Sequence, residues 1–227
     1  MMERTAVEGR SAEAPTRNRA LDPAIELSGL RRDFGDRTAL DGLDLRVETG
    51  ASVAILGPNG SGKSTLLRIL AGLLRPSAGE VSVLGFSLPK ETHRLGGKVG
   101  YLGHEPLLYR DLSPRENLQL AAALNGIGEE TAGARIERLM DTVGMSARAA
   151  DRVAELSAGM RQRIDICRAI LHEPPLLLFD EPDAHLDPDA RREIAPLIAA
   201  GDGRTRIVVS HDRGAATEDS DFVMELG

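Results

Sequence analysis

Aromatic residues and cysteine are scarce in this 227-residue chain, and their scarcity excludes several classes of protein. The sequence has no tryptophan, two tyrosines and four phenylalanines, and its one cysteine is Cys167. One cysteine cannot form a disulfide within the chain, as expected for a reducing compartment. No apolar run approaches the ~20 residues needed to cross a bilayer. If the protein acts at a membrane, we expect another chain to do the spanning.

Dense basic clusters are also missing. The net charge is −7 and no Lys/Arg run is present, which argues against a nucleic-acid surface. Residues 1–22 are polar and poor in hydrophobic residues, so we expect a disordered tail rather than a signal peptide. A basic arm that touches a membrane is the alternative, through Arg4, Arg10, Arg17 and Arg19. Interspersed acids and the lack of aromatic residues disfavour it.

A glycine-rich segment carries the strongest signal in the chain. It has the pattern G-x-x-x-x-G-K-[ST] of a phosphate-binding loop. The segment comprises Gly57, Pro58, Asn59, Gly60, Ser61, Gly62, Lys63, Ser64 and Thr65. A buried strand is expected just before it and a helix just after it. Backbone N–H groups and the helix N-terminus would then bind phosphate. Lys63 would reach the β- and γ-phosphates, and Ser64 would ligate Mg²⁺.

Two acids follow a second apolar run, at residues 176–179. Buried parallel strands have this composition, and ligands bind at their carboxyl ends. Asp180 is placed to hold Mg²⁺ through water, and Glu181 can polarise an attacking water. A later strand, over residues 206–211, ends in His211, and a lone histidine there is more often structural. Phe34 could stack on a flat base, but composition alone favours a core position.

Helical patterns fill residues 107–157, where no strand is evident. Ser113 and Glu116 form a capping box, with Pro114 at the first helical position. Further helices are predicted over residues 131–143, 147–154, 157–172 and 187–200. Ser157 is a plausible N-cap for the third of these. Cys167 shares its apolar face, so we expect a core thiol rather than a nucleophile. Other strands are predicted over residues 25–30, 43–48, 79–83, 98–102 and 221–226.

These motifs, in this order and spacing, resemble those of the ATP-binding-cassette (ABC) ATPases over about residues 25–226. The specific feature is Leu156-Ser157-Ala158-Gly159-Met160, at the place of the family signature LSGGQ, shortly before the acid pair. The resemblance implies an α/β fold with a P-loop NTPase (RecA-like) core. It also implies an N-terminal antiparallel β subdomain and an inserted α-helical subdomain over about residues 104–157, all within an ATPase domain of residues 23–227.

The resemblance implies a role for each matching residue. Phe34 would stack on adenine, contrary to the preference from composition. Asp180 would be the Walker B carboxylate, Glu181 the general base and His211 the switch histidine that contacts the γ-phosphate. Residues 184–187 would form the D-loop between the two sites of a dimer. The γ-phosphate of ATP on an opposite, head-to-tail subunit would be bound by Ser157, Ala158, Gly159 and Met160.

Some residues depart from the family pattern. His104 stands where the family usually has the Q-loop glutamine, which touches Mg²⁺ and the attacking water. Imidazole can ligate a metal or accept a hydrogen bond, so we expect His104 to serve both purposes. Ala158 and Met160 replace a glycine and the glutamine of the signature, but Ser157 and Gly159 are kept. We therefore expect a working site.

The resemblance is greatest to the ATP-binding subunit of the haem exporter of cytochrome c maturation, on Tyr101-Leu102-Gly103-His104 and the Leu-Ser-x-Gly-Met signature. Another small-substrate or lipid exporter is the next alternative. ATP, Mg²⁺, a second ATP-binding subunit and a membrane-spanning partner are implied, with the chain at the cytoplasmic face of the membrane. Outside transport, an iron–sulfur-assembly-type ATPase is the alternative. The site residues disfavour a pure binding module.

Overall fold

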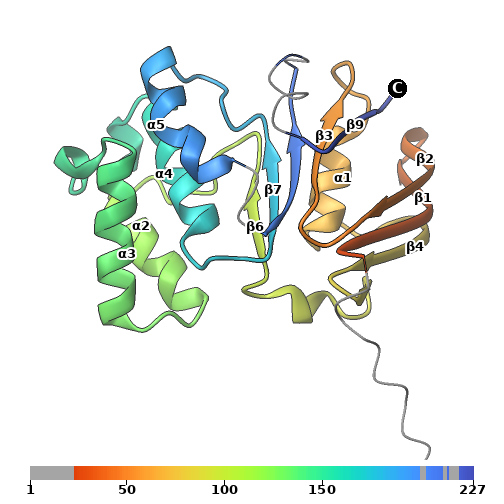
Figure 1. Ribbon diagram of the computed structural model, residues 1–227, viewed down its shortest axis with the longest axis horizontal. Helices are drawn as coiled ribbons and strands as arrows, with labels where there is room; N and C mark the ends of the chain where they lie inside the picture. Colours follow the sequence, from red (N-terminus) through yellow and green to blue (C-terminus); the bar gives the residue numbers. More distant parts are fainter. Residues whose placement is uncertain (1–22, 200–202, 212–213, 215–219) are drawn as a thin grey trace, which may run out of the picture.

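Two sheets form the centre of the fold (Figure 1). The computed structural model describes residues 23–199, 203–211, 214 and 220–227; the expected tail over residues 1–22 lies outside them. The parallel sheet has the order β6 (Val99–Leu102), β7 (Leu176–Asp180), β8 (Thr205–Val209), β3 (Ser52–Leu56) and β9 (Phe222–Glu225). The antiparallel sheet has the order β2 (Arg37–Val47), β1 (Ile25–Phe34), β4 (Ala78–Val83) and β5 (Phe86–Leu88). The expected α/β fold with an N-terminal antiparallel sheet is therefore confirmed.

The parallel sheet aligns the ends of three strands that lead into predicted site segments. Every residue of β3 and β7 is buried, as expected of parallel strands covered on both faces. In the ladder, Asp180 pairs with Val209 and Val209 pairs with Ile55. The residues that follow these three positions therefore lie along one edge of the sheet, at the top of Figure 1.

Five α-helices of the described part of the chain pack around the sheets. They are α1 (Lys63–Leu70), α2 (Pro114–Leu124), α3 (Glu129–Thr142), α4 (Ala158–Ile170) and α5 (Pro188–Ile198). The capping box at α2 is present: Ser113 Oγ accepts from Glu116 N, and Ser113 N donates to Glu116 Oε2 at 2.8 Å. The N-caps Ser157 and Asp187 are present as well. In Figure 1, α2 and α3 lie on the opposite side of the parallel sheet from the antiparallel one.

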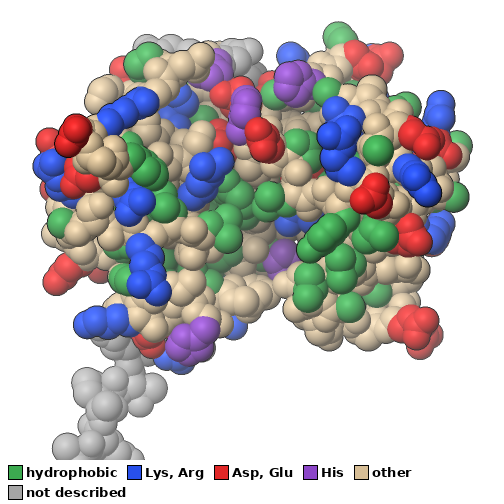
Figure 2. Space-filling view, turned by 180° about the vertical axis from the view of Figure 1, so that it is seen from behind, with side chains coloured by type: hydrophobic (Ala, Val, Ile, Leu, Met, Phe, Trp, Pro, Cys, Tyr) green, Lys and Arg blue, Asp and Glu red, His purple; other side chains and the backbone are tan. Residues whose placement is uncertain are grey.

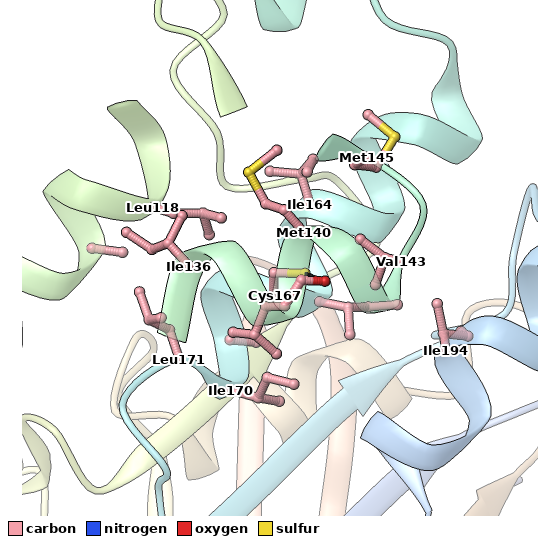
Figure 3. Packing of buried hydrophobic residues seen from close by; sticks show 14 of the residues in the cluster. Leu118, Ile136, Met140, Val143, Met145, Ile164, Cys167, Ile170, Leu171 and Ile194 are labelled. Atoms are coloured by element: carbon pink, nitrogen blue, oxygen red, sulfur yellow. Dashed lines mark hydrogen bonds between the residues drawn. The ribbon is translucent and has the colours of Figure 1, made fainter. Parts of the chain in front are cut away.

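A hydrophobic core holds α2, α3 and α4 together (Figure 3). Its buried side chains include Leu118, Ile136, Met140, Ile164 and Cys167. They come from one face of each helix, as the helical spacing of apolar residues predicts. These three helices therefore enclose an apolar interior, which is continuous with the face of β7 that carries Leu177 and Phe179.

The cysteine in this core is expected to be unreactive in the folded protein. Cys167 is fully buried, its Sγ donates to Leu139 O at 3.8 Å, and burial raises its pKa to about 12. Because only the thiolate is nucleophilic, Ellman's reagent should release no chromophore from the native chain at pH 8. One equivalent should appear after addition of guanidinium. Rapid reaction of the native chain would contradict the buried position.

Several sequence predictions were wrong in detail. A helix was predicted over residues 147–154, but this stretch contains two one-turn 3₁₀ helices, Ser146–Arg148 and Val153–Glu155. The N–H groups of Val153 and Ala154 donate to the carbonyls of residues 112 and 110 instead of continuing a helix. Strand β5 was not predicted, and α4 ends at Ile170 rather than at residue 172.

In the part of the chain that the structure describes, no helix combines the length and the hydropathy that a bilayer crossing requires.

Candidate nucleotide-binding site

The predicted phosphate-binding loop joins β3 to α1. Gly57, Gly60 and Gly62 have φ values of 152°, 84° and 96°, a backbone region that favours glycine. Ser61 N donates to Pro58 O at 3.3 Å, and the first helical bond of α1 runs from Leu66 N to Gly62 O. The loop therefore wraps the N-terminus of α1, where unpaired N–H groups favour an anion.

Lys63 points back over the loop rather than out to solvent. It is buried, and its Nζ donates to the carbonyls of Gly57 and Pro58, both at 2.8 Å. These two bonds fix the ammonium in the concave face of the loop, where an incoming phosphate would meet both the charge and the loop N–H groups.

Two loop glycines, Gly57 and Gly62, have no room for a side chain, and Gly62 offers a clean test. A Cβ on Gly62 would lie 2.4 Å from the backbone O of Ala39. We expect Gly62→Ala to lower both nucleotide affinity and the unfolding midpoint, because the rigid β2 backbone forces the loop to move. Gly85→Ala is the matched control, since its φ of 77° is also positive but nothing lies within 4 Å. Thermal unfolding and nucleotide titration measure both effects; equal behaviour of the two variants would contradict the packing argument.

The carboxyl ends of β7 and β8 bring two acids and a histidine together. Asp180 is 3% exposed, and its Oδ2 has no hydrogen-bond partner among the residues that the structure describes. Glu181 has a φ of 53°, and its N–H donates to Val209 O at 3.0 Å. Nε2 of His211 lies 2.6 Å from Oε1 of Glu181. The carboxylate of Glu181 is thus held by His211, which lies just after the end of β8.

An open cavity of about 470 Å³ connects the phosphate loop to Glu181, while Asp180 and His211 lie outside its lining. Its lining includes the predicted residues Phe34, Asn59, Gly60, Gly62, Lys63, Ser64, Thr65, His104 and Glu181. Phe34 is 46% exposed, so the core position favoured by composition was wrong. Its ring stacks against Arg32, whose guanidinium carbon lies 4.4 Å from the ring centroid. The structure therefore brings these predicted residues to one cavity.

The residues of the signature lie outside this cavity. Ser157 Oγ accepts from Met160 N at 3.2 Å, and α4 begins at Ala158. A Cβ on Gly159 would lie 2.7 Å from His185 O. The signature therefore packs against the predicted D-loop of its own chain and does not reach its own phosphate loop.

Two residues of the site were missed from the sequence. Arg37 lines the cavity, and its Nη2 donates to Gly60 O at 3.2 Å. Gln162 is buried, and its Nε2 lies 3.3 Å from the carbonyls of Glu181 and Pro182. The carbonyl that Gln162 meets is that of the predicted general base, so this amide fixes the turn after β7. No local motif marks either residue, because each acts on a distant segment.

The chemistry of the cavity fits a magnesium ion bound with a nucleotide. Among the residues described, no group of three or more His, Cys, Asp and Glu side chains could hold a metal alone. Mg²⁺ usually takes one or two carboxylates, waters and substrate phosphates rather than such a cage. The unpartnered, buried Oδ2 of Asp180 and the Ser64 side chain at the cavity wall suit that mode of binding.

A separate apolar groove is lined by residues of β6, α2 and α4 and by the segment that follows α1. Its volume is about 430 Å³, and its lining includes Leu73, Tyr101, Leu107, Tyr109, Leu120, Leu124, Arg168 and His172. The side chain of Leu124 is 77% exposed and that of Tyr109 is 63% exposed. In Figure 2 the surface is hollowed between two lobes, and hydrophobic side chains gather along the hollow.

Comparison with known proteins agrees with this geometry. The ABC transporter family model matches residues 40–184. The daunorubicin resistance ATP-binding protein DrrA3 of Streptomyces coeruleorubidus is 40% identical over 173 residues, which are 76% of this chain and 55% of DrrA3. The chain thus spans little more than half the length of that relative. The lipoprotein-releasing system ATP-binding protein LolD of Chromohalobacter salexigens is 39% identical over 89% of this chain and 90% of its own length.

The solved structures include close matches to the fold. The ATP-binding cassette MJ0796, in a dimeric post-hydrolysis state with ADP and Pi, superposes with a TM-score of 0.81 at 28% identity. The match covers 89% of this chain and 94% of that one. Family model, relatives and fold agree, and the chain belongs to the ABC transporter family as an ATP-binding cassette.

Proposed function

We propose that this chain is the ATP-binding and ATP-hydrolysing subunit of an ABC transporter, which powers export through a separate membrane-spanning partner. The observation that carries the proposal is the cavity that joins the phosphate loop, Phe34, His104 and Glu181. Residues 23–227 act as one ATPase domain, and the helical segment over residues 104–157 faces the partner. That partner holds the chain at the cytoplasmic face of the membrane.

ATP is contacted both at its adenine base and at its phosphates. The exposed ring of Phe34 stacks on adenine, a contact that requires an accessible face. Residues 57–65 surround the phosphates, and the ammonium of Lys63 exchanges its carbonyl partners for β- and γ-phosphate oxygens. Ser64 and Asp180 hold Mg²⁺, with His104 as a further ligand at the cavity wall. When bound, the ion neutralises charge that develops on the phosphates.

Hydrolysis uses the Glu181 carboxylate as the general base. It accepts a proton from the water that attacks the γ-phosphate, which requires a fixed orientation toward that water. His211 holds one carboxylate oxygen at 2.6 Å, and Gln162 holds the backbone behind it. His211 also contacts the γ-phosphate, and His104 hydrogen-bonds the attacking water.

Two chains are needed for a complete site. Ser157, Ala158, Gly159 and Met160 lie at a helix N-terminus that favours an anion but does not face its own phosphate loop. In a head-to-tail dimer, each signature binds the γ-phosphate held by the opposite chain. ATP then links the chains, and hydrolysis separates them.

The apolar groove is the place for the membrane-spanning partner. Exposed leucine and tyrosine side chains in a hollow are typical of an interaction site. The groove is lined by Leu107, close to His104 in sequence, so occupation of the groove acts on the catalytic site. Opening and closing of the dimer thereby moves the partner.

The cargo is the narrower part of the proposal. Haem export is proposed from the residues around His104 and from the signature. The similar proteins named above concern daunorubicin resistance and lipoprotein release, which support export of a small or lipid-linked substrate as the second candidate. If the chain were instead an iron–sulfur-assembly-type ATPase, its binding partners would not span a membrane.

Light scattering with size-exclusion chromatography tests the dimer directly. Glu181→Gln should elute as a dimer with ATP and Mg²⁺ and as a monomer with ADP, because its bound ATP is not consumed. Adding Ser157→Arg, which fills the signature, should leave a monomer in both. A double variant that still dimerises with ATP would refute the proposed role of the signature.

A further inference from the structure

A buried ion pair on α4 is not used by the proposed chemistry. Nε of Arg168 donates to Oδ1 of Asp165 at 2.5 Å, one turn apart on the helix. The Asp165 side chain is fully buried, and that of Arg168 is 19% exposed. A buried pair of this kind is weak evidence for stability, because desolvation offsets much of the attraction. Its position therefore calls for another explanation.

The pair reaches both sides of the turn that carries His104. On one side, Arg168 Nη2 donates to Tyr101 O at 2.6 Å, at the end of β6. On the other side, the carboxylate of Asp165 lies near the backbone of Leu107. Burial raises the pKa of this carboxyl, and Arg168 and the Leu107 backbone oppose that shift only in part. The segment between these contacts, residues 102–106, contains His104 and is called here the His104 turn.

The same pair lies between the apolar groove and the signature. Arg168 and Leu107 both line the groove. Asp165 and Arg168 belong to the helix whose first turn is the signature. A group placed in the groove would therefore meet Arg168 and Leu107, next to one end of the His104 turn.

We propose that Asp165 and Arg168 are positioning residues, which hold the His104 turn against α4 so that His104 faces the cavity. The proposal rests on the proposed function of His104 in hydrolysis. Neither residue lines the cavity, so neither touches ATP. Loss of the pair should release the turn and slow the chemical step without weakening nucleotide binding.

A spin label on the turn tests this without any assay of turnover. Glu105 is exposed, and Cys167 is buried, so Glu105→Cys can be labelled with a nitroxide at one position. In that background, Asp165→Asn keeps the side-chain volume, and Arg168→Met keeps the aliphatic stem. Either variant should sharpen the room-temperature EPR spectrum, because the turn gains motion. Circular dichroism first establishes that each labelled variant is folded.

A second ion pair on the same helix supplies the matched control. Arg163 Nη1 donates to Glu193 Oε2 at 2.9 Å and to Val143 O at 3.0 Å, toward α5 and the end of α3 rather than toward the turn. Glu193→Gln should leave the spectrum unchanged. In unlabelled protein, Asp165→Asn should lower kcat about tenfold with KM for ATP within twofold, and Glu193→Gln should change neither.

The outcomes separate the two proposals. A sharpened spectrum with unchanged kcat would support the positioning role of Asp165 and Arg168 but refute the role of His104 in hydrolysis. An unchanged spectrum in folded Asp165→Asn or Arg168→Met would overturn the positioning role. Equal sharpening by Glu193→Gln would also overturn it, because the effect would then be a general loosening of α4.

Discussion

Replacing Glu181 by glutamine should stop ATP turnover while ATP still binds. The amide fills the same space but cannot accept the proton of the attacking water, and loss of a general base typically costs ~10²–10⁴-fold in rate. The phosphate loop and Phe34 are untouched, so the dissociation constant for ATP should stay within about twofold. Phosphate release and titration with a fluorescent ATP analogue measure the two quantities.

A matched acid is available for the control. Glu80 lies exposed on the antiparallel sheet, outside the cavity lining, and Glu80→Gln should hydrolyse ATP at the native rate. If Glu181→Gln turns over normally, Glu181 is not the base. If Glu181→Gln also loses ATP binding, the turn after β7 has collapsed. The test is then His211→Ala, which should reduce kcat with ATP binding intact.

Replacing Lys63 by alanine should remove most of the affinity for ATP. A hydrogen bond to a charged group contributes about 1.5–3 kcal/mol, which corresponds to roughly 10- to 150-fold in the dissociation constant. The buried ammonium makes two such bonds, to the carbonyls of Gly57 and Pro58, and it is placed to offer them to phosphate instead. Isothermal titration with ATP and Mg²⁺ measures the loss.

The loss of loop structure must be separated from the loss of phosphate contact. Lys63→Met keeps the aliphatic stem in its buried position but makes no hydrogen bond, and it should bind ATP as weakly as Lys63→Ala. Lys90→Ala removes an exposed lysine that lies outside the cavity lining, and it should bind normally. Native affinity in Lys63→Met would show that the ammonium does not contact the nucleotide.

Local patterns in the sequence predicted most of the fold because its elements obey local rules. The buried runs of β3 and β7, the capping box at Ser113 and the N-cap at Ser157 each depend on a few adjacent residues. The helix prediction over residues 147–154 was wrong for the opposite reason. Its N–H groups bond to residues 110 and 112, and helical periodicity contains no information on such contacts.

The site residues also divide into those that a local motif predicts and those that it does not. The phosphate loop and the acid pair follow from motifs, because each acts through neighbours in the chain. Composition wrongly favoured a core position for Phe34, because large aromatic side chains are usually buried, and in the structure it is 46% exposed. Arg37 and Gln162 act on carbonyls far along the chain, so no pattern near them indicates their role.

The most direct test of the account is capture of the membrane-spanning partner. Tagged Glu181→Gln, with ATP and Mg²⁺, is incubated with detergent-solubilised membranes of the source cell, and bound chains are identified by mass spectrometry. Leu124→Asp in the same background places a charge in the apolar groove and serves as the matched control. We predict recovery of a multi-spanning protein by Glu181→Gln and its loss in the groove variant, and the identity of that protein would separate haem export from the other cargoes. Recovery of only soluble partners would contradict the role in transport and favour an assembly-type ATPase.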